Sequence, residues 1–509
     1  MSLRLHLTPL ADTLPQVSPR PPGSLAAGLA DAFRKASGLD GQLARLRAPN
    51  ALVVTTGQQP GLFTGPLYTL YKALSAAALA ELLEERWSRP VIPVFWLAND
   101  DHDYAEARET AWLGAEGELV RGALPERPAD APLTPMYRLP LGPEVDAILS
   151  EFERTVAPLA YADTAVAWLR RHYRPKRALG DAFADALAEL LAPFGVLCLD
   201  STHEAAKSAA APILLRALEA APGLEQGLVR RAAELQAAGR PTPVATGDGA
   251  ALVFVEDEVG RDRLVIADGA FVARRAGRRF DRAELVRIAE REPSRLSPNV
   301  LLRPVIESAL LPTVAYVAGP GELAYLPLAR PLYEWLEIPA QTPMPRWSGM
   351  IVEPRVDRVL DKHESTIEEL LAGQTLEKRV VRAALPPELR DAAERLGHAI
   401  DADYQVIRRS AVAIDPTLDR PIDRFRHQAI EGLDQAVGKV ERHLRRREAT
   451  ELAQITRART AVQPDGRPQE RVLGPAGFLA RYGPGFADTV ASGIREWYAN
   501  ALVAASASP

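Results

Sequence analysis

The chain has 509 residues, of which 47% are hydrophobic and 25% are charged, as in a globular protein that buries a substantial core. With 61 lysines and arginines against 66 aspartates and glutamates, its net charge of −5 excludes a global basic field for nucleic acid or an anionic membrane. It has one cysteine and no apolar run near the roughly 20 residues of a membrane span, so we expect a cytoplasmic protein of roughly three domain-sized units.

Two apolar strands joined by a polar loop and a helix are predicted in the first quarter of the chain. The first strand covers residues 51–55, the loop Gly57–Gly65 follows, and a helix runs from about 66 to 87. Pro66 suits the first helical position because proline lacks only an N–H that would be unpaired there. A second strand at 91–98 completes a right-handed βαβ unit of a parallel sheet.

The loop and the helix that follows it have the chemistry of an anion site. Glycines let backbone N–H groups approach a ligand closely, and a helix N-terminus favours negative charge. Lys72, two turns into the helix, could reach a phosphate or a carboxylate. The candidate binding residues of this segment are Gly57, Gln58, Gln59, Gly61, Thr64, Gly65, Tyr68 and Lys72. A tight turn with solvated glutamines and an exposed lysine is the alternative interpretation.

The second strand ends in the acidic cluster Asp100, Asp101, His102 and Asp103. Such a cluster could bind a metal, supply a general base, or hold a ribose or an amine. No HExxH, CxxC or paired-histidine motif accompanies it, so we predict no protein-bound metal. His102 is interpreted as a neutral hydrogen-bonding or acid/base group at the carboxyl end of a strand, where doubly wound sheets bind ligands. A structural turn is the alternative.

Helices and one further apolar strand follow. Helical patterns at 145–171 and 179–191 lead to a strand at 195–201, whose continuous apolar run is typical of burial on both faces of a sheet. Cys198 lies inside this strand and is predicted to be a buried, inert thiol. Asp200 stands at the strand's end and is a further candidate binding residue.

An inserted β-meander is predicted at 241–280, where short apolar runs alternate with Gly- and Asp-bearing turns. Arg303 lies in a short extended stretch before a helix at 305–310; it could clamp a carboxylate bidentately or form a surface ion pair. A strand at 313–318 then ends in a loop with three further candidate binding residues: Gly319, Gly321 and Glu322.

Beyond Pro354 the sequence predicts helices only. One apolar stripe recurs every seven residues, at Ala393, Ile400, Ile407 and Ile414. A second recurs every eleven, at Ile422, Leu433, Leu444 and Ile455. Asp415-Pro416 ends the first helix, because proline excludes the helical conformation from the residue before it. A second helix of roughly 40 residues would be a rod of about 60 Å. A long hairpin whose stripe needs covering is interpreted as an arm that joins two copies of the chain.

Several of these motifs occur together in a recognisable order. They are Thr56–Thr69, Pro93–Ala98 with Asp101–Asp103, Arg303-Pro304 with Gly319–Tyr325, and the tail Gln454–Arg471. With them the sequence resembles, nearly end to end, the cysteine-adding enzymes of bacillithiol biosynthesis, the BshC family.

The resemblance implies an α/β fold with a Rossmann-like parallel-sheet core, related to class I aminoacyl-tRNA synthetases and nucleotidyl transferases. It also implies inserted connecting segments and a C-terminal α-helical coiled-coil hairpin. On this basis we expect a core at 1–350 with insertions near 114–178 and 223–296. A coiled-coil arm at 351–463 and a segment at 464–509 that returns to the core complete the chain.

The resemblance further implies a ligase that adds L-cysteine to the amine of glucosaminyl-malate, the last step of bacillithiol biosynthesis. ATP would be the activating cosubstrate, any metal would be the magnesium that a nucleotide carries, and the protein would be a homodimer. Asp101, His102 and Asp103 would orient the amine and accept its proton, while the glycine loop would hold a nucleotide phosphate or a malyl carboxylate. The alternatives are a nucleotide-sugar enzyme or nucleotidyltransferase on the same core, or a non-catalytic coiled-coil scaffold.

Overall fold

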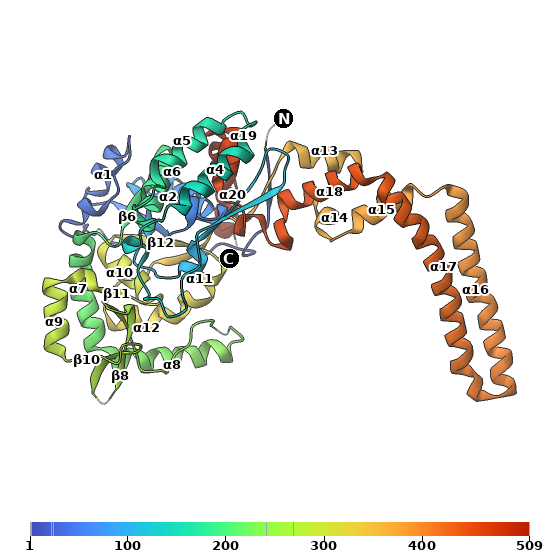
Figure 1. The fold of residues 1–509 in the computed structure, drawn as a ribbon. Helices are drawn as coiled ribbons and strands as arrows, with labels where there is room; N and C mark the ends of the chain where they lie inside the picture. Colours follow the sequence, from blue (N-terminus) through green and yellow to red (C-terminus); the bar gives the residue numbers. More distant parts are fainter. Residues whose placement is uncertain (1–2, 22, 24, 241, 268, 508–509) are drawn as a thin grey trace. The chain divides into compact units, whose positions relative to one another are not determined.

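The computed structural model describes residues 3–21, 23, 25–240, 242–267 and 269–507 (Figure 1). The chain forms two compact units. The larger contains residues 3–351 and 467–509, and the smaller contains residues 352–466. Among the described residues, no helix is both long and apolar enough to cross a membrane.

A five-stranded parallel sheet forms the centre of the larger unit. Its strands, in spatial order, are β13 (Thr342–Pro345), β12 (Thr313–Ala318), β2 (Leu52–Gln58), β3 (Val91–Leu97) and β6 (Leu197–Asp200). The last four confirm the strands predicted from apolar runs, and β13 was not predicted. Because all five strands run the same way, the polar residues that follow β2, β3 and β12 meet at one edge of the sheet.

The helix α2 (Leu67–Trp87) connects β2 to β3 and packs against both strands (Figure 1). It has no Gly or Pro in its interior and is rich in Leu and Ala, which are strong helix formers. Pro66 is its N-cap, so the helix begins at Leu67, one position later than we predicted. Pro93 lies inside β3 and has no N–H to donate to a neighbouring strand. This costs no hydrogen bond to β6, because β6 pairs with β3 only from Val94 onward.

Further helices surround this sheet. Residue Arg303 begins α10 (Arg303–Leu310), so the prediction of an extended stretch there was wrong. Pro304 is tolerated in the first helical turn, where its missing N–H costs nothing. The other helices of the unit are α1 (Asp40–Leu46), α3 (Tyr104–Ala107), α4 (Glu144–Val156), α5 (Ala162–His172), α6 (Leu179–Leu191), α7 (Glu204–Glu219), α8 (Ala221–Ala237), α9 (Arg282–Arg291), α11 (Pro320–Tyr325), α12 (Arg330–Trp335), α19 (Pro475–Tyr482) and α20 (Gly485–Ala507).

A second sheet of five antiparallel strands is inserted in the same unit. In spatial order it comprises β10 (Arg279–Phe280), β9 (Ala270–Ala273), β8 (Gly260–Ala267), β7 (Ala250–Asp257) and β11 (Leu296–Pro298). It confirms the predicted meander at 241–280, of which residues 241 and 268 lie outside the described residues, and extends it by β11. Two smaller pairs are β4 (Glu109–Leu113) with β5 (Leu119–Ala123), and β1 (Arg4–Leu7) with β14 (Gly349–Val352).

The smaller unit is helical, as predicted. Its helices are α13 (Pro354–Lys362), α14 (Ile367–Leu371), α15 (Thr375–Ala383), α16 (Pro387–Ile414), α17 (Asp419–Arg447) and α18 (Ala449–Val462). Helices α16 and α17 lie side by side as a hairpin (Figure 1). The single rod predicted for the second half of the hairpin is wrong, because the chain leaves the helical conformation at Glu448 and α18 packs against α13, α14 and α15.

Candidate functional site

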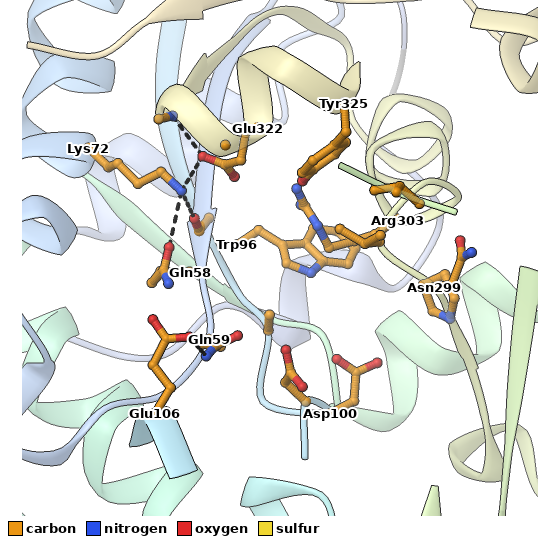
Figure 2. A pocket seen from close by; sticks show the side chains of 18 of the residues that line it. Gln58, Gln59, Lys72, Trp96, Asp100, Glu106, Asn299, Arg303, Glu322 and Tyr325 are labelled. Carbon is orange, nitrogen blue, oxygen red and sulfur yellow. Dashed lines mark hydrogen bonds and ion pairs between the residues drawn. The ribbon is translucent and has the colours of Figure 1, made fainter. Parts of the chain in front are cut away.

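A cavity of about 480 Å³ lies at the edge of the parallel sheet where β2, β3 and β12 end (Figure 2). Many of the predicted site residues line it: Gly57, Gln58, Gln59, Tyr68, Lys72, Asp100, Asp101, Arg303, Gly319, Gly321 and Glu322. Others lie outside the lining: Gly61, Thr64, Gly65, His102, Asp103 and Asp200. The sheet thus brings together predicted site residues that are up to 265 positions apart in the chain, from Gly57 to Glu322.

Gly57 allows the backbone of β2 to lie close to the backbone of Trp96 and to the side chain of Arg303. A Cβ at this position would lie 2.9 Å from the Trp96 carbonyl oxygen and 3.5 Å from Arg303 Nη1. Real Cβ atoms do not come so near to a backbone oxygen, so a larger residue would displace β3 or the guanidinium. Glycine is therefore required here for space, and its backbone torsions lie outside the left-handed region.

Lys72 is buried beside the pocket, which contradicts the alternative of an exposed lysine. Its Nζ lies 2.6 Å from Glu322 Oε2, 2.7 Å from the Gly57 carbonyl oxygen and 3.1 Å from Gln58 Oε1 (Figure 2). An ammonium group has three donors, and these contacts use all of them. Burial lowers the pKa of Lys72, and the Glu322 carboxylate opposes this shift. Lys72 therefore fixes Gln58 and Glu322 in place and has no donor left for a ligand.

Arg303 is held by a buried network. Its Nη1 lies 2.8 Å from Glu307 Oε2, and its Nη2 donates to the Tyr316 hydroxyl at 2.7 Å. The Tyr316 hydroxyl in turn donates to Glu322 Oε1 at 2.6 Å. Burial raises the pKa of the fully buried Glu307 to about 7. A guanidinium has five N–H donors, so Arg303 keeps donors for a ligand, and the alternative of a surface ion pair is wrong.

Four further arginines line the pocket and were missed by the sequence analysis: Arg261, Arg263, Arg346 and Arg471. Arg346 is buried and forms an ion pair with Glu470 at 2.5 Å. Arg471 is exposed and, among the described residues, has no ion pair. The quoted tail motif Gln454–Arg471 contains Arg471, but no quoted motif contains Arg346. The place of both residues in the fold depends on contacts between distant segments.

Some backbone donors at the end of the glycine loop and at the start of α2 are bonded within the protein. The Thr64 N–H donates to the Tyr173 hydroxyl at 2.8 Å, and the Leu67 N–H donates to the Leu473 carbonyl at 2.8 Å. The Gly65 N–H donates to the Leu62 carbonyl at 3.0 Å. These three N–H groups are thus satisfied within the protein. Arginine side chains supply positive charge to the pocket.

Asp101 and Asp103 of the acidic cluster after β3 make different contacts. Asp101 Oδ1 accepts the backbone N–H groups of His102 and Asp103 at 2.6 Å and 3.2 Å, which leaves Oδ2 for the pocket. Asp103 accepts the Glu106 N–H at 3.3 Å and so caps α3. Among the described residues, no group of three or more His, Cys, Asp or Glu side chains is arranged to hold a metal ion.

His102 lies beside the pocket wall and contacts Arg261. Arg261 Nη1 lies 3.3 Å from His102 Nδ1, and because a guanidinium can only donate, Nδ1 is the acceptor in this contact. Neutral His102 therefore carries its proton on Nε2. Burial lowers the pKa of His102, and the Arg261 charge lowers it further. The imidazole is thus neutral near pH 7, and its donor group is Nε2–H.

Two predicted residues near β6 lie away from the pocket. Asp200 pairs with Arg34 at 2.6 Å and accepts from the Asn99 side-chain amide at 3.1 Å. It lines a separate cavity of about 990 Å³. Cys198 is buried, and burial raises the pKa of its thiol to about 12, which confirms an inert cysteine.

Two family models match the chain in sequence order. The model described as "Bacillithiol biosynthesis BshC, N-terminal Rossmann-like domain" matches residues 25–347. The model described as "Bacillithiol biosynthesis BshC, C-terminal coiled-coil domain" matches residues 349–495. Together the two matches span both units and account for the α/β core and the helical hairpin.

Similar proteins from several bacteria carry the name "Putative cysteine ligase BshC". The protein from Solibacter usitatus is 33% identical over 448 residues, with 87% of this chain and 82% of the relative covered. The protein from Heliobacterium modesticaldum is 32% identical over 494 residues, covering 93% and 88%. The protein from Prosthecochloris aestuarii is 29% identical over 470 residues, covering 89% and 82%.

Proposed function

Since this chain belongs to the BshC family of bacillithiol biosynthesis, we propose that it is a cytoplasmic ligase that adds L-cysteine to the amine of glucosaminyl-malate. This addition would be the last step of bacillithiol biosynthesis. The observation that carries the proposal is the charge distribution of the pocket, which combines arginines with two carboxylates at the end of β3. The acceptor has the complementary groups, namely malyl carboxylates and a sugar amine.

In the proposed mechanism Arg303 and Arg471 bind the malyl carboxylates. Arg303 is preorganised by Glu307 and Tyr316, and a preorganised guanidinium binds a carboxylate with two parallel hydrogen bonds. Asp100 lies on the side of the pocket where β3 ends, across from the pair of Lys72 and Glu322 (Figure 2). Asp101 follows it in the chain and also lines the pocket. The sugar amine is therefore assigned to the carboxylate side.

Asp101 is the proposed proton acceptor. The neutral amine attacks the activated carboxyl carbon of cysteine, the C–N bond forms, the activating group leaves, and the nitrogen gives up a proton. Asp101 Oδ2 takes that proton, because Oδ1 is engaged by the loop backbone. His102 donates from Nε2 and is not the base, since its other nitrogen faces Arg261.

We propose ATP as the cosubstrate that activates the cysteine carboxyl group. The N–H groups of Thr64, Gly65 and Leu67 do not fit a triphosphate in this structure, because they are bonded to Tyr173, Leu62 and Leu473. No residue of the loop is therefore assigned to the nucleotide, and none of the steps above depends on where the nucleotide binds.

We also propose that the protein is a homodimer joined through the hairpin of α16 and α17. No residue of α16 is buried within one chain, and Ile407 and Ile414 of its apolar stripe are 47% and 83% exposed. Phe425 on α17 is 55% exposed. Apolar side chains gathered on a solvent-exposed hairpin are stabilised when a second copy covers them.

The ligase is tested by incubating the purified protein with glucosaminyl-malate, L-cysteine and ATP, with mass detection of the product and of AMP against ADP. We expect a product heavier than the acceptor by one cysteinyl residue, formed only when all three compounds are present. An acceptor that stays unmodified, or a sugar nucleotide that turns over without cysteine, would contradict the proposal.

The roles proposed for Asp101 and His102 predict how much kcat falls in each variant in the same assay. Asp101→Asn removes the proton acceptor and should lower kcat by about 10²–10⁴, the usual contribution of general base catalysis. His102→Gln keeps a side-chain donor and should lower kcat less. The matched variant Asp103→Asn alters a helix cap outside the lining and should leave kcat within about threefold of the parent. A larger loss in His102→Gln than in Asp101→Asn would reverse the two roles.

A further inference from the structure

A second buried lysine, Lys207, lies behind the carboxylate side of the pocket. It belongs to α7, and its side chain is 4% exposed. Its Nζ lies 3.3 Å from Asp100 Oδ2 and 3.1 Å from the Leu296 carbonyl oxygen of β11. Asp100 lines the pocket and Lys207 does not. The lysine thus contacts the site only through Asp100.

The contacts of Asp100 leave it capacity to accept a further hydrogen bond. A carboxylate has about four lone-pair positions. The Ser201 hydroxyl donates to Oδ1 at the long distance of 3.4 Å, and Lys207 approaches Oδ2. Asp101 differs, because its Oδ1 is already held by two backbone N–H groups at shorter distances. The backbone N–H of Asp100 is a third donor to the Asp100 carboxylate, so one lone-pair position remains for a ligand.

The charges around Asp100 keep it ionised. Burial alone would raise the pKa of this carboxyl group, but Lys207 and then Arg261 outweigh burial and lower it. A buried ion pair adds little net stability, and apolar residues of similar size often replace such a pair without loss. The pair of Lys207 and Asp100 is thus poorly explained by stability alone, and its position at the pocket points to a ligand with a complementary charge.

We propose that Lys207 is a positioning residue that keeps Asp100 charged and oriented, so that Asp100 binds the amino group of the acceptor. The inference rests on the proposed function and adds the residue that recognises the amine and the residue that supports it. Asp100 anchors the nitrogen as an ammonium group, which loses one proton to water before the attack, and Asp101 takes the second proton as the C–N bond forms. Lys207 acts on the ligand through Asp100 and never contacts it.

The test compares two ligands that differ only at the nitrogen: glucosaminyl-malate and its N-acetyl derivative. Their dissociation constants are measured by calorimetry with the parent and with Lys207→Met, which keeps the length of the side chain and removes its charge. We expect the parent to prefer the free amine by about tenfold or more, and Lys207→Met to lose most of that preference. Binding of the N-acetyl compound should change less than about threefold, because it does not use the charge of Asp100.

Two matched variants separate positioning from stability. Ser201→Ala removes a neutral contact to the same carboxylate and should keep the preference. The electroneutral double variant Asp100→Asn, Lys207→Met should recover the melting temperature lost in Lys207→Met, yet not the preference for the amine. A preference that returns with stability would overturn the inference, as would an unchanged preference in Lys207→Met.

If Lys207→Met does not fold, the electroneutral double variant Asp100→Asn, Lys207→Met provides the test. It should not prefer the free amine, and a preference equal to that of the parent would overturn the inference. A parent that binds neither compound would instead contradict the proposed function itself.

Discussion

At the scale of single residues, charge in the pocket is organised by ion pairs. Lys72 is paired with Glu322, and Arg303 with Glu307. Lys72, Glu322 and Arg303 line the pocket, and Glu307 does not. Because a buried charge without a partner is costly, these residues have to be considered in pairs when their variants are interpreted.

His102 makes a prediction about the pH dependence of stability. Its pKa in the folded protein lies below the ordinary value, first through burial and then through Arg261. The unfolded chain therefore binds the proton more readily, and the stability that neutral His102 contributes is lost as the pH falls through the folded-state pKa. We expect the melting temperature of the parent to fall relative to His102→Gln between pH 7.5 and 5.5. A difference between the two proteins that is independent of pH would contradict the assigned neutral state.

Gly57 makes a prediction about packing. Gly57→Ala places a Cβ 2.9 Å from the Trp96 carbonyl oxygen and should cost about 1–3 kcal/mol of unfolding free energy, as overpacking does. It should also weaken binding of glucosaminyl-malate, because Arg303 Nη1 lies next to the new atom. Gly321→Ala is the matched control, since a Cβ there meets no atom within 4 Å. Urea unfolding and calorimetry measure both effects, and equal losses in the two variants would refute the steric argument.

At the scale of elements, the segment after the arm is clamped to the sheet edge by Glu470. Its carboxylate accepts from Arg346 at 2.5 Å and 2.8 Å and from the Ser348 hydroxyl at 3.1 Å. Arg346 lies directly after β13 and also lines the pocket. The returning segment therefore holds one wall of the site, and residues far from the sheet in sequence influence its shape.

Glu470→Gln should destabilise the protein by about 3–5 kcal/mol, the usual cost of removing one partner from a buried ion pair. The control is Glu334→Gln, which breaks an exposed pair with Arg330 and should cost less than about 1 kcal/mol. Chemical unfolding of both variants measures the difference. A similar cost for the two would show that the Glu470 clamp adds no more than a surface pair.

The sequence predicted the strands of the sheet because burial on both faces leaves a continuous apolar run, as in β3 and β12. It also predicted which residues gather at the sheet edge, since parallel strands place their carboxyl ends together. It did not predict that the N–H groups of Thr64 and Leu67 are bonded to Tyr173 and Leu473, residues that only the tertiary fold brings near. Arg261 and Lys207 were missed for the same reason, because they come from an inserted sheet and a crossover helix that carry no motif.

At the scale of the whole molecule, the arm makes a prediction about assembly. Of the apolar stripe that recurs every eleven residues, Leu444 and Ile455 are buried within one chain. In the stripe that recurs every seven residues, Ile407 and Ile414 are exposed. The double variant Ile407→Asp, Ile414→Asp should convert a dimer to a monomer in light scattering at micromolar concentration. Val503→Asp, at a 72% exposed valine outside the arm, should remain dimeric. A parent that is already monomeric under these conditions would contradict the proposed arm.

The central claim is that the pocket where β2, β3 and β12 end binds the acceptor of the ligation. The most direct measurement is a crystal structure of the protein with glucosaminyl-malate bound. We predict density in this pocket, with the malyl carboxylates at Arg303 and Arg471 and the sugar nitrogen at Asp100. Density for the ligand at another site, such as the cavity beside Arg34 and Asp200, with this pocket empty, would contradict the account.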